Sequence, residues 1–221
     1  MTDGPTNPTP GGMPGVPASL VDRAKNILLS PNTEWRRIAG EQSSVSSMFA
    51  GYAMILAALP LIASIIGMLA FTTTVAGITY RPPMGMIIGM AAVGYIIQLG
   101  VVYLMGLIVG ALSPGFGGGN DKLAGFKISV YATTPVWILG IIAIFPPLAP
   151  LVYLAYLYVI YLIYTGVGPV LGVPEDKAVV ATLVIVAAYI VLMIVLAIVV
   201  TMVVMGILAS IFMTGAAMTT Y

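Results

Sequence analysis

The sequence predicts an all-α integral membrane protein: a bundle of five transmembrane helices with a short cytoplasmic N-terminal amphipathic helix. Two observations carry this prediction. Hydrophobic residues make up 60% of the 221 residues and charged residues only 7%, against about 25% in a typical soluble domain. The charges also leave four long stretches without any Asp, Glu, Lys or Arg: residues 42–80, 82–120, 128–174 and 178–221. Because a charge at the bilayer centre costs about 2.5–3.5 kcal/mol, such stretches suit lipid better than water.

Residues 1–18 contain five prolines and four glycines, and this composition cannot bury enough apolar surface to fold. We expect a disordered tail. The tail also lacks the basic start and the apolar core of a secretory signal peptide. The first apolar run begins near Met48, so we expect that run to act as the insertion signal and to remain in the protein.

Residues 19–47 are predicted to form a cytoplasmic amphipathic segment that begins with a short helix over residues 19–30. Ser19 and Asp22 have the spacing of a helix cap, and Pro31 ends the helix. At helical spacing, the apolar face holds Leu20, Ala24, Ile27 and Leu28, and the polar face holds Arg23, Lys25 and Asn26. Two interpretations remain open: the helix lies in the headgroup layer, or it packs against the cytoplasmic ends of the spans.

A membrane domain over residues 48–213 is predicted to contain the five spans. About 20 residues cross a hydrocarbon core, so the longest charge-free run needs two spans, and Pro146, Pro147 and Pro150 divide it. Pro60 is expected to loosen or kink the first span. A short non-cytoplasmic tail over residues 214–221 follows the last span. The predicted spans are Phe49–Phe71, Met84–Leu112, Phe126–Phe145, Leu151–Val167 and a helix from just after Pro174 to about Met205.

The basic residues orient these spans. With the sides of the membrane numbered alternately, only Arg81 lies on the side opposite the N-terminus. Because basic residues favour the cytoplasmic side, we expect a cytoplasmic N-terminus and a non-cytoplasmic C-terminus. If the chain is bacterial, it belongs in the plasma (inner) membrane. The N-terminal side carries Arg23, Lys25, Arg36, Arg37, Lys122, Lys127 and Lys177.

The residue types exclude several kinds of chemistry. The chain contains no Cys and no His, which excludes disulfides, zinc–thiolate sites, thiol nucleophiles and histidine bases. It also lacks the motifs of a phosphate-binding P-loop, a metal site and a nucleophile elbow. Every acidic residue lies at or near a membrane boundary, so a proton relay of buried carboxylates is not expected. We therefore expect a protein that is not an enzyme, uses no cofactor or metal and, at a net charge of +1, binds no nucleic acid.

Polar side chains inside the spans are few. Gln98, in the middle of the second span, either bonds a group on a neighbouring helix or lines a polar path. The first interpretation is favoured, because one Gln without charged partners makes a poor conduction site. Ser129, Thr133 and Thr134 lie in the third span just before Pro135. Their hydroxyl groups are expected to satisfy the backbone groups that this proline leaves free.

Small and aromatic residues also recur at helical spacing. Gly85–Gly89 and Gly106–Gly110 are two GxxxG pairs on the second span, for which packing within the chain is favoured over dimerisation. Four tyrosines cluster on one side of the fourth span: Tyr153, Tyr156, Tyr161 and Tyr164. Packing and anchoring at the interface are favoured for them over an aromatic ligand groove.

Three stretches together resemble a known family. They are LLSPNTEWRRIAGE at Leu28–Glu41, YATTPVWI at Tyr131–Ile138 and YLIYTGVGPVLGVPEDKA at Tyr161–Ala178. In this order, with five spans, they resemble the Yip1 family of five-span membrane proteins in its short bacterial form, over about residues 20–205. The resemblance implies five membrane helices and a cytoplasmic N-terminus. Eukaryotic relatives, with a longer N-terminal region, are associated with membrane traffic and small GTPases of the Rab type. For bacterial-type members it implies a fold and a topology, and it carries over no catalytic residue.

The expected function is interaction or organisation at the membrane. The expected partners are the lipid bilayer and another membrane or peripheral protein at the cytoplasmic face; no oligomeric state is predicted. Candidate contacts for anionic lipid or a partner are Arg23, Lys25, Trp35, Arg36, Arg37, Lys122 and Lys127. For the basic residues the alternative role is to set topology, and Trp35 suits an interface anchor.

Two other functions remain open. A small channel, carrier or lipid-handling protein would have a polar path near Gln98, Ser129 and Thr133. An enzyme acting on lipid would need an acid–base pair at the cytoplasmic face, where Glu41, Glu175 and Asp176 are available.

Overall fold

The structure, a computed structural model, describes residues 19–71, 73–75, 78–80 and 82–218. Most of this part of the chain is helical, and within it five helical stretches are long and apolar enough to cross a membrane. The predicted fold class is therefore confirmed. The predicted disordered tail over residues 1–18 and the last three residues, 219–221, lie outside the described residues.

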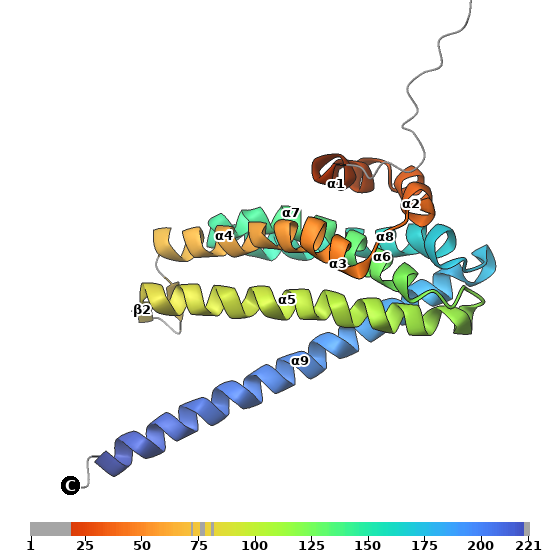
Figure 1. Cartoon of the computed structure of the whole chain (residues 1–221). Helices are drawn as coiled ribbons and strands as arrows, with labels where there is room; N and C mark the ends of the chain where they lie inside the picture. The colour runs from red at the N-terminus through yellow and green to blue at the C-terminus, as the bar shows by residue number, and fades with distance from the viewer. Residues whose placement is uncertain (1–18, 72, 76–77, 81, 219–221) are drawn as a thin grey trace, which may run out of the picture.

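Two short helices, α1 (Leu20–Leu29) and α2 (Pro31–Gly40), precede the spans and lie against the side of the bundle (Figure 1). Ser19 caps α1 as predicted, since its Oγ accepts a hydrogen bond from the Asp22 backbone N–H at 3.2 Å. Pro31 follows the end of α1 and occupies the first turn of α2, where its missing N–H needs no partner.

The first span is built from α3 (Val45–Met48), one π-helical turn η1 (Phe49–Ala53) and α4 (Met54–Ala70). It begins four residues before the predicted start at Phe49, because Ser44 and Ser47 form a reciprocal helix cap. Pro60 lies inside α4 without ending it. The second span, α5 (Met84–Leu112), has the predicted bounds.

A small antiparallel hairpin, which was not predicted from the sequence, connects these two spans. Its strands are β1 (Thr73–Val75) and β2 (Ile78–Tyr80), with Thr73 opposite Tyr80 and Val75 opposite Ile78. A single 3-10 turn, η2 (Ser113–Phe116), follows the second span.

The third and fourth spans form a pair that turns at the predicted proline cluster. The third comprises α6 (Lys122–Ala132), α7 (Thr134–Leu139) and η3 (Gly140–Ile144), and the fourth comprises η4 (Pro146–Val152) and α8 (Tyr153–Leu171). Asp121 caps α6 through its carboxylate, which accepts from Leu123 N–H at 2.8 Å, so the third span starts before the predicted Phe126. Thr134 Oγ1 donates to the carbonyl of Tyr131 at 2.7 Å, the group that Pro135 leaves without an N–H partner. The predicted role of this hydroxyl is confirmed.

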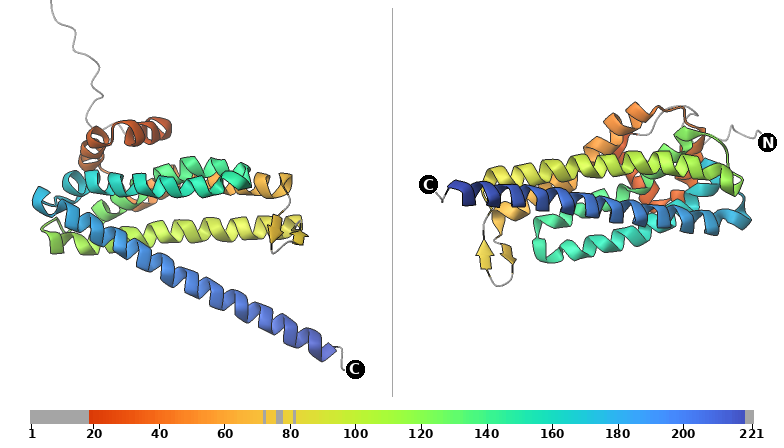
Figure 2. Two further views of the ribbon diagram at one scale, coloured as in Figure 1. Left: turned by 180° about the vertical axis from the view of Figure 1, so that it is seen from behind. Right: turned by 90° about the horizontal axis from the view of Figure 1, so that it is seen from below.

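The last span is α9 (Glu175–Met218), which begins at the predicted proline–acid start and continues across the predicted 213/214 boundary of the tail. It contacts α5 and α8. Figures 1 and 2 show α9 leaving the other helices progressively toward the C-terminus. Most of its described side chains are therefore exposed.

The centre of the bundle is α6, which packs against α5 on one side and α8 on the other. Every residue from Ala124 to Ala132 is buried. Gly106 and Gly110 of α5 make the close approach possible, since a Cβ at Gly125 would lie 2.3 Å from the Gly106 carbonyl oxygen. This GxxxG pair packs within the chain, as favoured, whereas a Cβ at Gly85 or Gly89 would meet nothing within 4 Å.

We predict that Gly125→Ala destabilises the bundle by about 1–3 kcal/mol, because the new methyl group forces the α5 and α6 backbones apart. Denaturant or thermal unfolding of the purified protein in a mild detergent measures this loss.

Gly89→Ala is the matched control. It makes the same change in a helix that has open space at that position, so it should leave stability unchanged or slightly raised. Equal losses for the two variants would contradict the close approach of α5 and α6.

Candidate functional site

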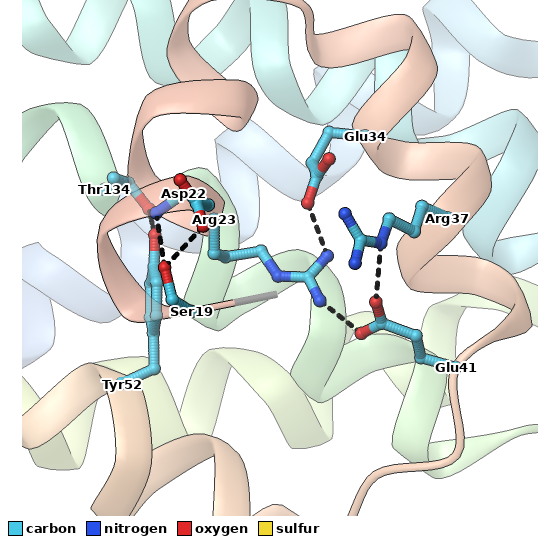
Figure 3. A network of polar contacts seen from close by, with 8 residues as sticks. All are labelled: Ser19, Asp22, Arg23, Glu34, Arg37, Glu41, Tyr52 and Thr134. Atoms are coloured by element: carbon cyan, nitrogen blue, oxygen red, sulfur yellow. Dashed lines mark hydrogen bonds and ion pairs between the residues drawn. The ribbon is translucent and has the colours of Figure 1, made fainter. Parts of the chain in front are cut away.

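A buried ion-pair cluster joins α1 to α2 and to Glu41, which follows α2 (Figure 3). Arg23 of α1 lies between two carboxylates: its Nη1 donates to Glu34 Oε1 at 2.6 Å and its Nη2 donates to Glu41 Oε2. Arg37 Nε lies 3.3 Å from the other oxygen of Glu41. The side chains of Arg23 and Glu34 are each only 4% exposed. A charge buried this deeply is stable only when it is paired, so these residues depend on one another.

The membrane spans also contact this cluster. The Arg23 guanidinium lies 5.3 Å from the ring centre of Tyr131 in the third span, within the range of a cation–π interaction. Burial lowers the pKa of Arg23, but the hydrogen bond and charge of Glu41, with smaller contributions from Tyr131 and Glu34, raise it further than burial lowers it. Arg23 therefore stays charged in its buried position.

This geometry corrects the prediction for Arg23. The sequence placed Arg23 on the exposed polar face of the first helix, but it is buried together with Ala24 and Ile27. The helical pattern predicted the wrong burial for Arg23 because it uses only the residues of α1. The two carboxylates that pair with Arg23 lie on α2 and just after it. Arg23 is thus not part of the surface that faces lipid headgroups or a partner.

Lys127 is the second buried basic residue. Its Nζ donates to the backbone carbonyls of Glu41 at 2.8 Å and Ala39 at 3.3 Å. Only 5% of the residue is exposed. Lys127 therefore links the middle of α6 to the end of α2 and the connection between α2 and α3. Like Arg23, it is not on the exposed surface.

Trp35 is fully buried, which corrects its prediction as an interface anchor. Its ring lies over Gly166 of α8, where an added Cβ would be 2.9 Å from the indole. Ile38 and Pro31, also on the inner face of α2, are buried as well. The proline, tryptophan and isoleucine thus lie on one buried face of α2, and their packing holds α2 against α8.

The first helix contacts the side of α8, well away from the end of that helix at Leu171. The hydroxyl of Tyr158 donates to the Leu28 carbonyl at 2.6 Å. Tyr158 is 13 residues before the end of α8 at Leu171, or about 20 Å along the helix axis. The first helix therefore packs against the spans, as one of the two interpretations predicted. It contacts the sides of the spans, however, and not their cytoplasmic ends.

Four of the predicted contact residues are exposed. Lys25 projects from α1, Arg36 and Arg37 from α2, and Lys122 from the first turn of α6. Of these four residues, Arg37 also pairs with Glu41 at the edge of the buried cluster. The structure thus divides the predicted set of basic residues into a buried pair, Arg23 and Lys127, and this exposed group.

The predicted polar residues of the spans all hydrogen-bond to backbone carbonyls. Gln98 Nε2 donates to Ala57 O of α4 at 3.0 Å, which confirms the favoured interpretation of a bond to a neighbouring helix. Ser129 Oγ donates to Val102 O of α5 at 2.6 Å. Thr133 Oγ1 donates to Ser129 O within its own span at 2.8 Å. Within the described residues, no three acidic side chains come together as a metal site.

The fold and these contacts can now be compared with known proteins. A family model described as the Yip1 domain matches residues 25–198. The chain belongs to the Yip1 family. The match begins within α1, two residues after Arg23, and ends within α9, so it includes α2 with Trp35, the first four spans and part of the fifth span of this Yip1 protein. Searches of curated proteins and of solved structures found no significant match.

We predict that Arg23→Met lowers the free energy of unfolding of this Yip1 protein by about 3–5 kcal/mol. Methionine keeps much of the length of arginine but leaves the buried carboxylate of Glu34 without its cation. Unfolding in a mild detergent measures the effect.

Arg36→Met is the matched control, because Arg36 is exposed on α2 and its loss should change stability by less than about 0.5 kcal/mol. Adding Glu34→Gln and Glu41→Gln to Arg23→Met should restore part of the lost stability by removing the unpaired charges. Similar stabilities for Arg23→Met and Arg36→Met would show that the buried cluster does not form.

Proposed function

We propose that this Yip1 protein is a non-enzymatic membrane protein that binds and organises a partner at the cytoplasmic face. The observation that carries the proposal is the group of exposed basic residues on α2 and at the start of α6: Arg36, Arg37 and Lys122. Arg36 and Arg37 project from α2, which the buried Trp35 holds against α8. Lys122 projects from the first turn of α6, in which residues 124–132 are buried. A rigid basic surface suits a partner that offers acidic groups, either a protein or anionic lipid headgroups.

The contacts inside the spans favour this function over a small channel, carrier or lipid-handling protein. Gln98 and Ser129 each bond a carbonyl on a neighbouring helix, and Thr133 bonds one within its own span. Such bonds strengthen helix packing and leave fewer groups to line a path for ions or polar solutes. An enzymatic function is also disfavoured, because Glu41, one of the three acids considered for it, is engaged by Arg23 and Arg37.

Native purification in a mild detergent, followed by mass spectrometry, tests the proposed partner. We expect a protein to co-purify with the wild type and its recovery to fall several-fold in Arg36→Glu, which reverses one exposed charge and leaves the α2 packing in place. Deleting residues 19–41 is a poor test, because this segment contributes Trp35 and Ile38 to the core.

Lys177→Glu is the matched control. Lys177 is an exposed basic residue in the first turn of α9, outside the proposed surface, so partner recovery should be unchanged. Recovery of the protein alone from wild-type membranes would argue against a stable partner, and equal recovery in both variants would place the contact elsewhere.

The proposed orientation, with the N-terminus in the cytoplasm, rests on the seven-to-one bias of basic residues between the two sides. A reporter that is active only in the cytoplasm should be silent when fused after Tyr221 and active when fused before Met1. Activity at the C-terminal fusion would contradict either the five spans or their direction.

A further inference from the structure

A pocket of about 530 Å³ lies between α5, α6, α8 and α9, within the membrane-spanning part of the bundle. Its closed end is lined by buried side chains, including Val109, Ile163 and Ile185. At its other end Tyr153 is 74% exposed and Ile190 is 53% exposed, so the pocket opens to the surroundings there. The closed end is the one nearer the turn between α8 and α9.

The pocket offers little to a polar ligand. None of the described residues that line it is charged. The hydroxyl groups of Ser129 and Thr133, which line its wall, already donate to the backbone carbonyls of Val102 and Ser129. Three tyrosines, at positions 153, 156 and 189, are the other polar lining residues. Because the inner wall is apolar and its hydroxyl protons are already used, an apolar ligand is favoured.

The size of the pocket excludes a helix as the occupant. An α-helix with its side chains is about 10 Å wide, so a volume of this size holds only about one helical turn. A single hydrocarbon chain is much thinner and can extend along the pocket. The occupant that fits both the shape and the chemistry is therefore a chain, and the surrounding bilayer supplies such chains.

The course of α9 gives that chain a way in. Figure 1 shows α9 close to the bundle near its start at Glu175 and increasingly distant beyond it. One wall of the pocket is formed by α9 side chains, among them Val186, Tyr189 and Met193. Tyr189 still meets Tyr156 of α8, with ring centroids 6.3 Å apart. Beyond it, the lining residues Ile190 and Ile194 are exposed, so the pocket is open to the side there.

We propose that this pocket binds one hydrocarbon chain of a bilayer lipid. The terminal methyl group of the chain points toward the α8–α9 turn, and the chain leaves the pocket past Tyr153 and Ile190. The bound chain fills the space between α8 and α9 that the protein leaves open. This site is independent of the basic surface proposed to bind a partner.

Photolabelling in reconstituted vesicles tests this site. The probe is a phosphatidylcholine that carries a diazirine near the methyl end of one acyl chain, mixed into unlabelled phosphatidylcholine. After irradiation, peptide mapping should find the label concentrated on residues of the closed end, such as Val109 and Ile163. Val186→Phe places a larger ring inside the pocket and should reduce this labelling several-fold.

Val191→Phe is the matched control, because it makes the same substitution on α9 at an exposed residue outside the pocket lining. It should label like the wild type. A second pair of variants on α8 repeats the comparison in case Val186→Phe fails to fold. Val159 lines the pocket, so Val159→Phe should reduce labelling, whereas Leu157 is exposed outside the lining, so Leu157→Phe should not. Monodisperse elution in detergent shows that each variant is folded.

The opposite result is equally clear. Label spread over the outward faces of the spans, and unchanged by Val186→Phe and Val159→Phe, would mean that the bilayer only surrounds the protein, and it would overturn the proposed site. Native mass spectrometry adds a second measurement: one lipid should stay bound per wild-type chain after detergent exchange, and Val186→Phe should lose it. Loss of the lipid without loss of the co-purifying partner would separate this site from the basic surface.

Discussion

The burial of residues 124–132 of the third span on every side is the constraint on which the rest of the structure depends. A helix surrounded in this way can approach its neighbours only where side chains are small, and Gly125 meets Gly106 and Gly110 at that point. Its one charged residue inside this region, Lys127, must find partners in the protein, because it cannot reach water freely. It finds them in the carbonyls of Ala39 and Glu41, and the segment before the first span is thereby fixed to α6.

The N-terminal helices also contain a buried charge that must find its partners within the protein. Arg23 is buried against Tyr131, and the carboxylates that neutralise it come from its own segment, since the described spans contain no acidic residue near it. Charge and packing therefore place α1 and α2 together on the flank of the bundle. The exposed basic residues of these helices, Lys25, Arg36 and Arg37, owe their positions to these buried neighbours. A backbone that is fixed in this way is suited to recognition, because little backbone freedom is lost when a partner binds.

The helix bounds that were predicted correctly follow from signals within the helices themselves or directly beside them. The bounds of α5 and the start of α9 at Glu175 follow from apolar length and from proline and acidic residues at a helix start. The first and third spans begin earlier than hydropathy suggests, because Ser44 and Asp121 cap them within polar sequence. The hairpin between the first two spans was missed, although the β-branched residues on both sides of Ala76–Gly77 are a signal for it. The positions of Arg23 and Trp35 could not be predicted locally, since their partners lie on other helices.

The course of α9 shows a second limit of the sequence. This helix is apolar on all sides, so no periodicity distinguishes the face that meets the protein from the face that meets lipid. Between helices in a bilayer there is also no hydrophobic force to close a gap, because lipid chains are as apolar as leucine. A span such as α9 can therefore leave its neighbours without a large loss of free energy, provided that lipid fills the space. In the pocket between α5, α6, α8 and α9, the proposed hydrocarbon chain would supply van der Waals partners for Val186 and Met193, which a void would leave without them.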